Sequence, residues 1–245
     1  MNNFKKFLRT KTTGVEIIIL LVGLVLVFTG AYIKNGYLKT AVSGIGISVF
    51  ASAIVVFMTD VFLGGDELEK IKQWGFEGVY STRGEMNSSC DLYLQKAKYV
   101  NVIAFGLKSL RDSQQKAIER ILRNGGTVRI ITMKPGCPNL AEREKDELQV
   151  EGSISDSVKR LIDWARQMNS RNYKGKIEIR YHEKQPLDFL FMMDNRLYTG
   201  PYEYGKSSQQ TISFEYSKAG AAYEYYKNYF YDLWNNEEFC ENALK

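Results

Sequence analysis

The sequence predicts a membrane protein in which an N-terminal transmembrane helical hairpin precedes a cytosolic α/β domain with a mixed sheet. Two uncharged apolar stretches within the first 63 residues predict the hairpin. Alternation of helix-type and strand-type periodicity further along the chain predicts the α/β domain. We therefore divide the chain into a hairpin over 1–64, a linker helix over 65–77 and a cytosolic domain over 78–245.

The two predicted spans cover residues 15–33 and 40–63. After Glu16 no charged residue occurs until Lys34, and the second span carries one acid near its end, Asp60. A bilayer core of about 30 Å requires about 20 helical residues, so both stretches are long enough. A cleaved signal peptide fits the first stretch less well. A second span follows after six residues, and no clean small-x-small cleavage site separates the two.

The charge distribution predicts the orientation of the hairpin. Residues 1–39 hold six basic side chains and one acid, which accounts for the whole net charge of +5. The remainder of the chain is neutral, so the basic character does not indicate a nucleic-acid-binding surface. Four basic residues precede the first span, whereas two lie in the turn. The positive-inside rule then places both termini, and with them residues 64–245, in the cytoplasm.

Small residues mark one face of the second span, namely Gly44, Ser48, Ser52 and Thr59. Such residues let helices approach closely, so this face either packs within the hairpin or an oligomer, or lines a pore. If it lines a pore, Asp60 forms a ring at the cytoplasmic mouth and favours cations.

The first half of the cytosolic region contains a helix, a glycine turn, a second helix, a strand and a third helix. Residues 99–105 combine β-branched and aromatic side chains, and Asp112 is the expected N-cap of the next helix. Paired glycines at 125–126 end that helix. The predicted ranges, in order, are 66–74, 75–78, 86–98, 99–105 and 112–123.

The second half begins with a buried strand, TVRIITM, followed by a turn at 134–136. A helix follows, with its apolar residues on one face. Four strands come next, and the second and third of them form a hairpin that turns at Asp194-Asn195. The closing helix is rich in tyrosine. The predicted ranges are 127–133, 155–168, 177–182, 189–193, 196–199, 211–216 and 221–234.

Four segments together resemble one half of the phospholipase D-like fold, over about residues 78–236. They are STRGEM to LKSL (81–110), AIERILRNGGTVRIITM (117–133), FMMDNRLYTGPYEYGKSSQQTISFE (191–215) and YYKNYFYDLW (225–234). In that family a hairpin carries an HxKxxxxD motif, and a glycine-containing loop forms the other wall of a phosphodiester site. The resemblance implies a cleft shaped for a phosphodiester.

The catalytic motif is missing from this register. Alignment of the hairpin aspartate with Asp194 puts Leu187 and Phe189 where the family has its histidine and lysine. The single histidine, His182, begins an HxK triplet, but Asp188 follows one residue too early and Pro186 interrupts the segment. Without a positioned nucleophile no covalent phospho-intermediate forms. We therefore expect no enzymatic activity, no catalytic residues, no metal and no cofactor.

Basic and hydrogen-bonding residues nevertheless gather near the expected cleft. Lys108 and Lys134 follow predicted strands, and the loop 202–211 follows the hairpin. We expect these groups to bind phosphates and base edges, and the tyrosines to stack on bases. Alternatively, the lysines are solvated surface charges and the tyrosines pack on the sheet. The remaining candidate ligand-binding residues are Lys206, Ser207, Ser208, Gln209, Gln210, Tyr198, Tyr202 and Tyr204.

A two-helix hairpin joined to a small cytosolic sensor resembles the membrane effectors of nucleotide-signalled anti-phage defence, the Hailong type among them. This resemblance of architecture implies an ion channel gated by an oligonucleotide or cyclic nucleotide, with a nucleotidyltransferase as partner. Two helices cannot enclose a pore alone, so we expect a homo-oligomer, with four subunits as the working number. The alternatives are a membrane-anchored phospholipase D-like phosphodiesterase and a tethered binding or assembly module.

Overall fold

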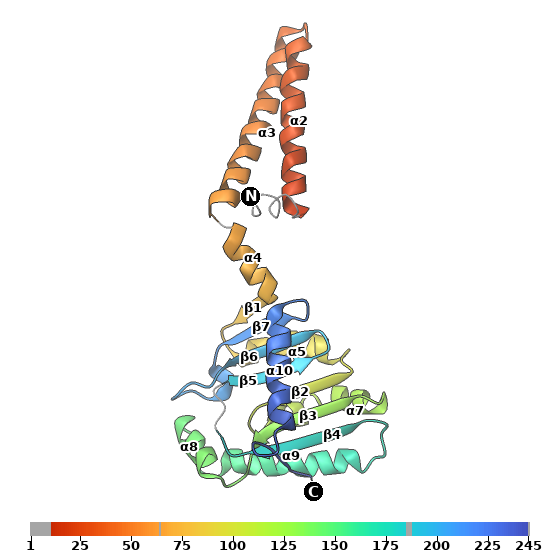
Figure 1. The fold of residues 1–245 in the computed structure, drawn as a ribbon, viewed down its shortest axis with the longest axis vertical. Coiled ribbons are helices and arrows are strands. Elements are labelled where there is room, and N and C mark those ends of the chain that lie inside the picture. The colour runs from red at the N-terminus through yellow and green to blue at the C-terminus, as the bar shows by residue number, and fades with distance from the viewer. Residues whose placement is uncertain (1–10, 64, 185–187, 245) are drawn as a thin grey trace. The chain divides into compact units, whose positions relative to one another are not determined.

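The computed structural model describes residues 11–63, 65–184 and 188–244, and the chain forms two compact units, residues 1–71 and 72–245. The first unit contains helices α2 (Lys11–Tyr32) and α3 (Gly36–Leu63), which lie side by side as a hairpin (Figure 1). Both helices are long and apolar enough to cross a membrane. Asn35 caps α3, because its side-chain oxygen accepts hydrogen bonds from the backbone N–H groups of Tyr37 and Leu38.

Glycines allow the two helices of the hairpin to approach closely. A Cβ on Gly46 would lie 2.6 Å from the Val27 nitrogen, and one on Gly23 would lie 2.7 Å from the Phe50 nitrogen. By contrast, a Cβ on Gly44 would meet nothing within 4 Å. The contact between α2 and α3 therefore runs along a different face from the one that carries Gly44.

Gly44, Ser48 and Ser52 are all exposed on the surface of the hairpin. The interpretation that these three residues pack inside the hairpin is therefore wrong, because the contact face of α3 is formed by other residues. Packing between copies of the chain and lining of a pore both stay as predictions. The side chains of Thr59 and Asp60 lie outside the described residues.

The second unit is built on an eight-stranded mixed sheet with the order β1-β7-β6-β5-β2-β3-β4-β8. Strands β2, β3 and β4 are parallel, and the other pairings are antiparallel. The predicted mixed sheet is thus confirmed. The strands are β1 (Phe76–Tyr80), β2 (Tyr99–Ile103), β3 (Thr127–Met133), β4 (Lys176–His182), β5 (Asp188–Met193), β6 (Arg196–Pro201), β7 (Ser213–Ser217) and β8 (Glu241–Asn242).

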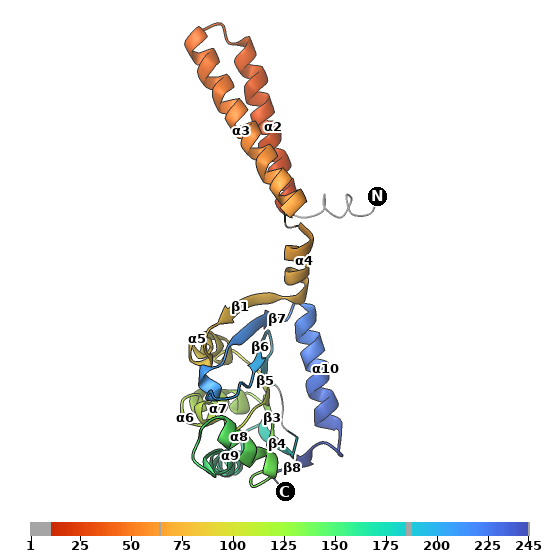
Figure 2. The same cartoon turned by 90° about the vertical axis from the view of Figure 1, so that its left-hand side faces the viewer.

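Helices cover both faces of the sheet (Figure 2). Helix α10 (Ala221–Asn235) lies on one face, and five helices lie on the other. The five are α5 (Arg83–Leu94), α6 (Lys108–Asp112), α7 (Gln115–Arg123), α8 (Pro138–Asp146) and α9 (Ser153–Asn169).

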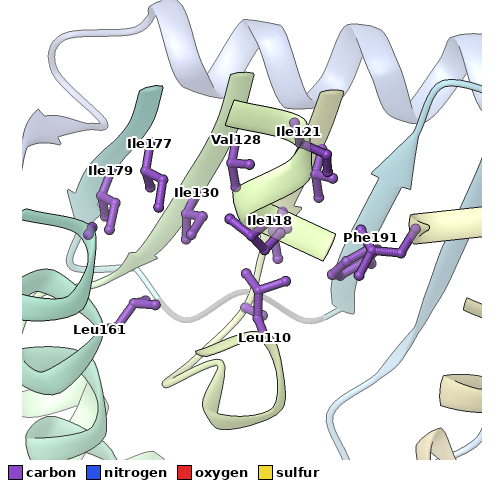
Figure 3. Close-up of a cluster of buried hydrophobic side chains, with 14 of the residues drawn as sticks. Leu110, Ile118, Ile121, Val128, Ile130, Leu161, Ile177, Ile179 and Phe191 are labelled. Atoms are coloured by element: carbon purple, nitrogen blue, oxygen red, sulfur yellow. The ribbon is translucent and has the colours of Figure 1, made fainter. Parts of the chain in front are cut away.

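Strand residues alternate between two buried clusters, as the two-residue period of a strand requires. In β3, Val128 and Ile130 belong to the cluster shared with α7 and α9, whereas Ile131 belongs to the cluster beneath α10. Figure 3 shows the larger cluster, in which Ile118 and Leu161 are completely buried. Each such side chain contributes about 1.5–3 kcal/mol through burial. The packing of Ile118 and Leu161 fixes α7 and α9 over the same face of the sheet.

Several local predictions are wrong in type or boundary. Residues 76–80, within or next to the predicted turn, form strand β1, which pairs with β7. Gly75 adopts a φ of +75° and lies against Gly220, so a long-range contact supports this edge strand. The predicted helix 112–123 begins at Gln115 as α7, and Asp112 ends the preceding helix α6 instead of capping α7. Helix α8 was not predicted. Helix α4 (Gly65–Trp74) covers the first ten residues of the predicted linker helix 65–77, and residues 76 and 77 belong to β1 instead.

We predict that Gly46→Leu weakens the hairpin by about 1–3 kcal/mol, because the added side chain overlaps the backbone of α2. Gly44→Leu is the matched control, since the same side chain enters open space there. Thermal loss of helical circular dichroism, recorded for the full chain in detergent, measures the difference. Equal effects of the two substitutions would contradict this packing.

Candidate functional site

A cavity of about 490 Å³ lies beyond the carboxyl end of β2. Its walls come from α5, the segment after β2, the start of α9 and strand β5. In open α/β sheets this edge is where ligands bind. The chain leaves β2 through two consecutive left-handed residues, Gly106 (φ +50°) and Leu107 (φ +47°), both of which line the cavity. Left-handed geometry is unusual for leucine and is typical of functional sites.

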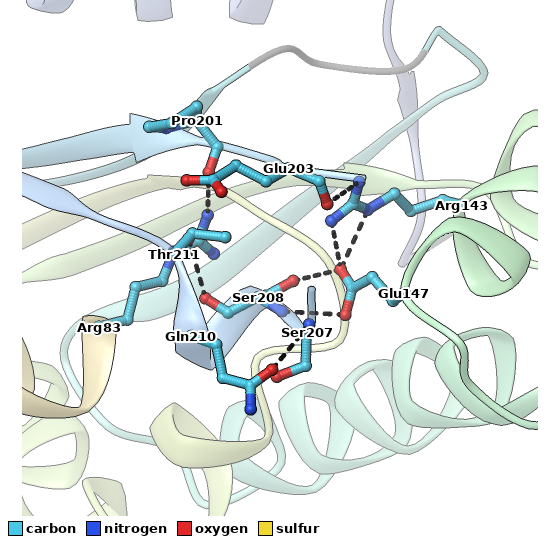
Figure 4. A network of polar contacts seen from close by, with 9 residues as sticks. All are labelled: Arg83, Arg143, Glu147, Pro201, Glu203, Ser207, Ser208, Gln210 and Thr211. Atoms are coloured by element: carbon cyan, nitrogen blue, oxygen red, sulfur yellow. Dashed lines mark hydrogen bonds and ion pairs between the residues drawn. The ribbon is translucent and has the colours of Figure 1, made fainter. Parts of the chain in front are cut away.

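The most unusual group in the cavity wall is Arg83, at the first position of α5. Its guanidinium carbon lies 3.8 Å from the ring centre of Phe189 and 4.5 Å from that of Tyr202. One Nη2–H donates to the Pro201 carbonyl at 3.2 Å (Figure 4). In the described part of the chain Nε is buried without a hydrogen-bond partner, and no carboxylate forms an ion pair with this side chain.

Burial makes this charge costly. The Arg83 residue is 6% exposed, and removal from water lowers the pKa of its guanidinium. Two aromatic faces compensate in part through cation–π attraction. A buried cation that lacks an anionic partner normally destabilises a fold by several kcal/mol. The arrangement is therefore suited to receive an anion.

The loop after β6 is held by hydrogen bonds to Glu147, which forms a buried ion pair with Arg143 of α8. Arg143, which is 1% exposed, donates from Nη2 to Glu147 at 2.8 Å and from Nε at 3.0 Å. Glu147 also accepts hydrogen bonds from the backbone N–H and the hydroxyl of Ser208 (Figure 4). Ser207 and Gln210 form a capping box around the short 3-10 helix η1 (Ser208–Gln210). These contacts fix the loop at the rim of the cavity.

Five of the predicted ligand-binding residues line this cavity. Lys108 comes from the start of α6, and Tyr202 follows β6. Ser207, Ser208 and Gln209 come from the loop that Glu147 holds. The structure therefore brings together groups that are about 100 residues apart in the sequence. Their placement agrees with a ligand site but does not identify the ligand.

The other five predicted residues lie elsewhere. Tyr198 is completely buried, and its hydroxyl hydrogen-bonds to Ser89, so it packs in the core and cannot stack on a base. Lys134 follows β3, two strands away from β5, and forms ion pairs with Glu241 at 2.8 Å and Glu183 at 3.5 Å.

The remaining three belong to the outer surface of the loop. Lys206 pairs with Glu203 at 2.5 Å, and Tyr204 is 82% exposed. The side chain of Gln210 accepts from the Ser207 backbone as part of the capping box. The side chains of Lys206 and Gln210 are therefore engaged in contacts within the loop and do not face the cavity lining.

Sequence reasoning missed Arg83, Asn87 and Arg160, which also line the cavity. One signal was present in the sequence. Thr82 caps α5 and puts Arg83 at the positive end of the helix dipole, where a cation is unfavourable. A cation at that position indicates a role other than helix stabilisation.

His182 does not line the cavity. It ends β4, is 3% exposed and stacks on the ring of Phe239 with 5.2 Å between ring centres. Burial lowers the pKa of His182 from 6.5 to about 4. Its environment is that of a neutral core residue, and Leu187, the other position of the motif, lies outside the described residues.

No protein-family profile and no curated protein sequence matches this chain. Among solved structures, TrmBL2, an archaeal chromatin protein described with a novel mode of DNA binding, is 16% identical. It has a TM-score of 0.42 over 79% of this chain and 68% of that one. NucT from Helicobacter pylori is 11% identical, with a TM-score of 0.41 over 67% and 97% of the two chains.

Phosphatidylserine synthase from Haemophilus influenzae Rd KW20 is 9% identical and has a TM-score of 0.48 over 86% of this chain. The match spans 48% of the synthase, or about half its length. TM-scores below 0.5 at such identities carry no argument about activity, so the functional case rests on the residues of the cavity.

We predict that stability falls as the pH drops from about 6.5 to about 4. In this window unfolded His182 binds a proton that the folded protein excludes. The loss contributed by this group amounts to about 3 kcal/mol at pH 4. Thermal melts of the full chain from pH 4 to 7 measure it. His182→Phe, which keeps an aromatic ring against Phe239, is expected to show a shallower decline, and parallel curves would contradict the assignment.

Proposed function

We propose that the cavity binds a phosphate-bearing ligand, a nucleotide or short oligonucleotide, and that this ligand regulates the membrane-embedded helices. The observation that carries the proposal is the buried guanidinium of Arg83, which has no carboxylate partner in the described part of the chain. A phosphate oxygen supplies the missing acceptor and the missing charge together.

The other groups at the cavity support this class of ligand. Lys108 and Arg160 are exposed cations at the cavity wall. The acid that lines it, Glu147, is already neutralised by Arg143. The described lining therefore carries an excess of positive charge. Amide side chains from Asn87 and Gln209 are suited to the edges of a base, and aromatic and aliphatic groups form the floor.

We propose binding without cleavage. Phe189 lies against Arg83 at the position where the phospholipase D-like resemblance requires a lysine. Among the described residues that line the cavity there is no histidine to act as nucleophile or base. A membrane-anchored phosphodiesterase is the competing hypothesis, and release of cleaved product in the binding experiment below would favour it.

For the whole chain we propose an oligomeric ion channel of the bacterial inner membrane, with both termini cytoplasmic, that acts as an effector in anti-phage defence. A nucleotidyltransferase would supply its ligand. The two membrane-competent helices support the membrane part of this proposal. The exposed face of α3 with Gly44, Ser48 and Ser52 supports association of several copies, here taken as four, around a path.

We predict that Arg83→Gln lowers affinity for a fluorescein-labelled, mixed-sequence tetradeoxynucleotide at least tenfold. Loss of a charge-assisted contact costs about 1.5–3 kcal/mol. Arg123→Gln is the matched control, because Arg123 is an exposed arginine of α7 outside the cavity. Fluorescence anisotropy with the full chain in detergent measures binding, and gel analysis of the same samples detects cleavage.

Thermal stability separates binding from folding in this experiment. In the absence of ligand the buried charge of Arg83, unpaired among the described residues, destabilises the folded protein. The Arg83→Gln variant should therefore melt at the same temperature as the parent protein or at a higher one. A large drop in melting temperature together with unchanged affinity would contradict the role of Arg83 and the proposal that rests on it.

We predict that Ser48→Leu and Ser52→Leu reduce ion conductance severalfold in planar bilayers, because bulky apolar side chains obstruct a path lined by this face. Ile45→Leu is the control, because Ile45 is exposed on the same helix and the substitution does not change the size of the side chain. Unchanged conductance in both serine variants would exclude this face as the lining of the pore.

A further inference from the structure

A second hollow, of about 580 Å³, adjoins the cavity. Arg160 lines both, so the two hollows meet at this side chain. The second hollow lies between α9 and the α6–α7 corner. Its lining residues are Arg111, Asp112, Gln115, Arg160, Asp163, Trp164 and Gln167.

One face of α9 forms a common floor for the two hollows. The lining residues of this helix recur at alternating spacings of four and three, which places them on a single stripe. The residues at these spacings are Ser153, Ser157, Arg160, Trp164 and Gln167, and Ile154 and Asp163 flank the stripe. At ~1.5 Å per residue the stripe runs for about 21 Å along the helix. That length exceeds what one nucleotide occupies.

Unpartnered polar atoms occur along this groove. In the second hollow the indole N–H of Trp164 and one terminal nitrogen of Arg111 are buried without a partner in the described structure. In the first cavity, Arg83 Nε and the hydroxyl groups of Tyr202 and Ser153 are likewise buried without a hydrogen-bond partner in the described structure. Buried donors are normally satisfied, so their concentration here indicates ligand groups that complete them.

The charges differ between the two hollows. In the second, Asp112 pairs with Arg111 at 2.6 Å, and Asp163 pairs with Arg166 at 3.5 Å. This hollow is thus close to neutral and suits a nucleoside more than a phosphate. Arg160, at the junction, forms no ion pair in the described part of the chain, which suits it to a phosphate that links two units.

We propose that the site is a groove along α9 that takes an oligonucleotide of at least two units, with Arg83 on one phosphate, Arg160 on the linking phosphate and the second nucleoside in the hollow beside Trp164. This inference rests on the proposed function and deepens it. A mononucleotide fills only the first cavity, so the groove discriminates by length.

The test compares fluorescein-labelled deoxymononucleotides and deoxydinucleotides, both 5′-phosphorylated and of mixed base, on the full chain in detergent. We expect the dinucleotides to bind at least tenfold more tightly. Arg160→Gln should narrow that gap, because it weakens dinucleotide binding about tenfold and mononucleotide binding by a smaller factor. Trp164→Phe keeps an aromatic ring and should weaken only dinucleotide binding, severalfold. Lys159→Gln is the matched control, because Lys159 is an exposed neighbour on α9 outside both hollows.

The two proposals fail in different ways. Equal affinity for the two probes, or equal loss of both in Arg160→Gln, would overturn the groove while mononucleotide binding that depends on Arg83 still supports the cavity. Binding of neither probe would overturn both proposals. An equal effect of Lys159→Gln and Arg160→Gln on the dinucleotide would show a nonspecific charge effect and would also overturn the groove.

Discussion

The buried ion pair between Arg143 and Glu147 is the interaction on which the geometry of the site depends. Both side chains are almost fully removed from water, and two hydrogen bonds join them. Such a pair adds little net stability, but removal of one partner leaves an uncompensated charge and costs about 3–5 kcal/mol. Because Glu147 also holds Ser208, the pair specifies where the loop after β6 lies.

The same pair determines the environment of Arg83 through Tyr202. The guanidinium carbon of Arg143 lies 4.9 Å from the ring centre of Tyr202, and the guanidinium carbon of Arg83 lies 4.5 Å from the same ring centre. One of these arginines has a carboxylate, whereas the other has aromatic rings and one carbonyl. This asymmetry distinguishes a cation that is paired within the fold from one that has no carboxylate ion pair among the described residues.

Close contact between α2 and α3 determines the structure of the hairpin. The glycines at 23 and 46 let the two helices approach closely, which is the kind of contact that joins helices where no hydrophobic effect drives their association. The contact uses one face of α3 and leaves Gly44, Ser48 and Ser52 on another. The small residues of this helix therefore divide into those that join the hairpin and those that stay exposed on its surface.

Local patterns in the sequence determined the apolar helices, strand β3, the hairpin that turns at Asp194 and the position of Lys108 beside the first parallel strand. These features depend on periodicity and turn chemistry within a few residues. Only the tertiary structure decided that Tyr198 is core, that Lys134 pairs with Glu241 and that Arg83 meets Phe189 and Tyr202. Each of these outcomes depends on groups about 100 residues apart. Burial and ion pairing between distant segments arise from the way the sheet assembles, and no local pattern carries that information.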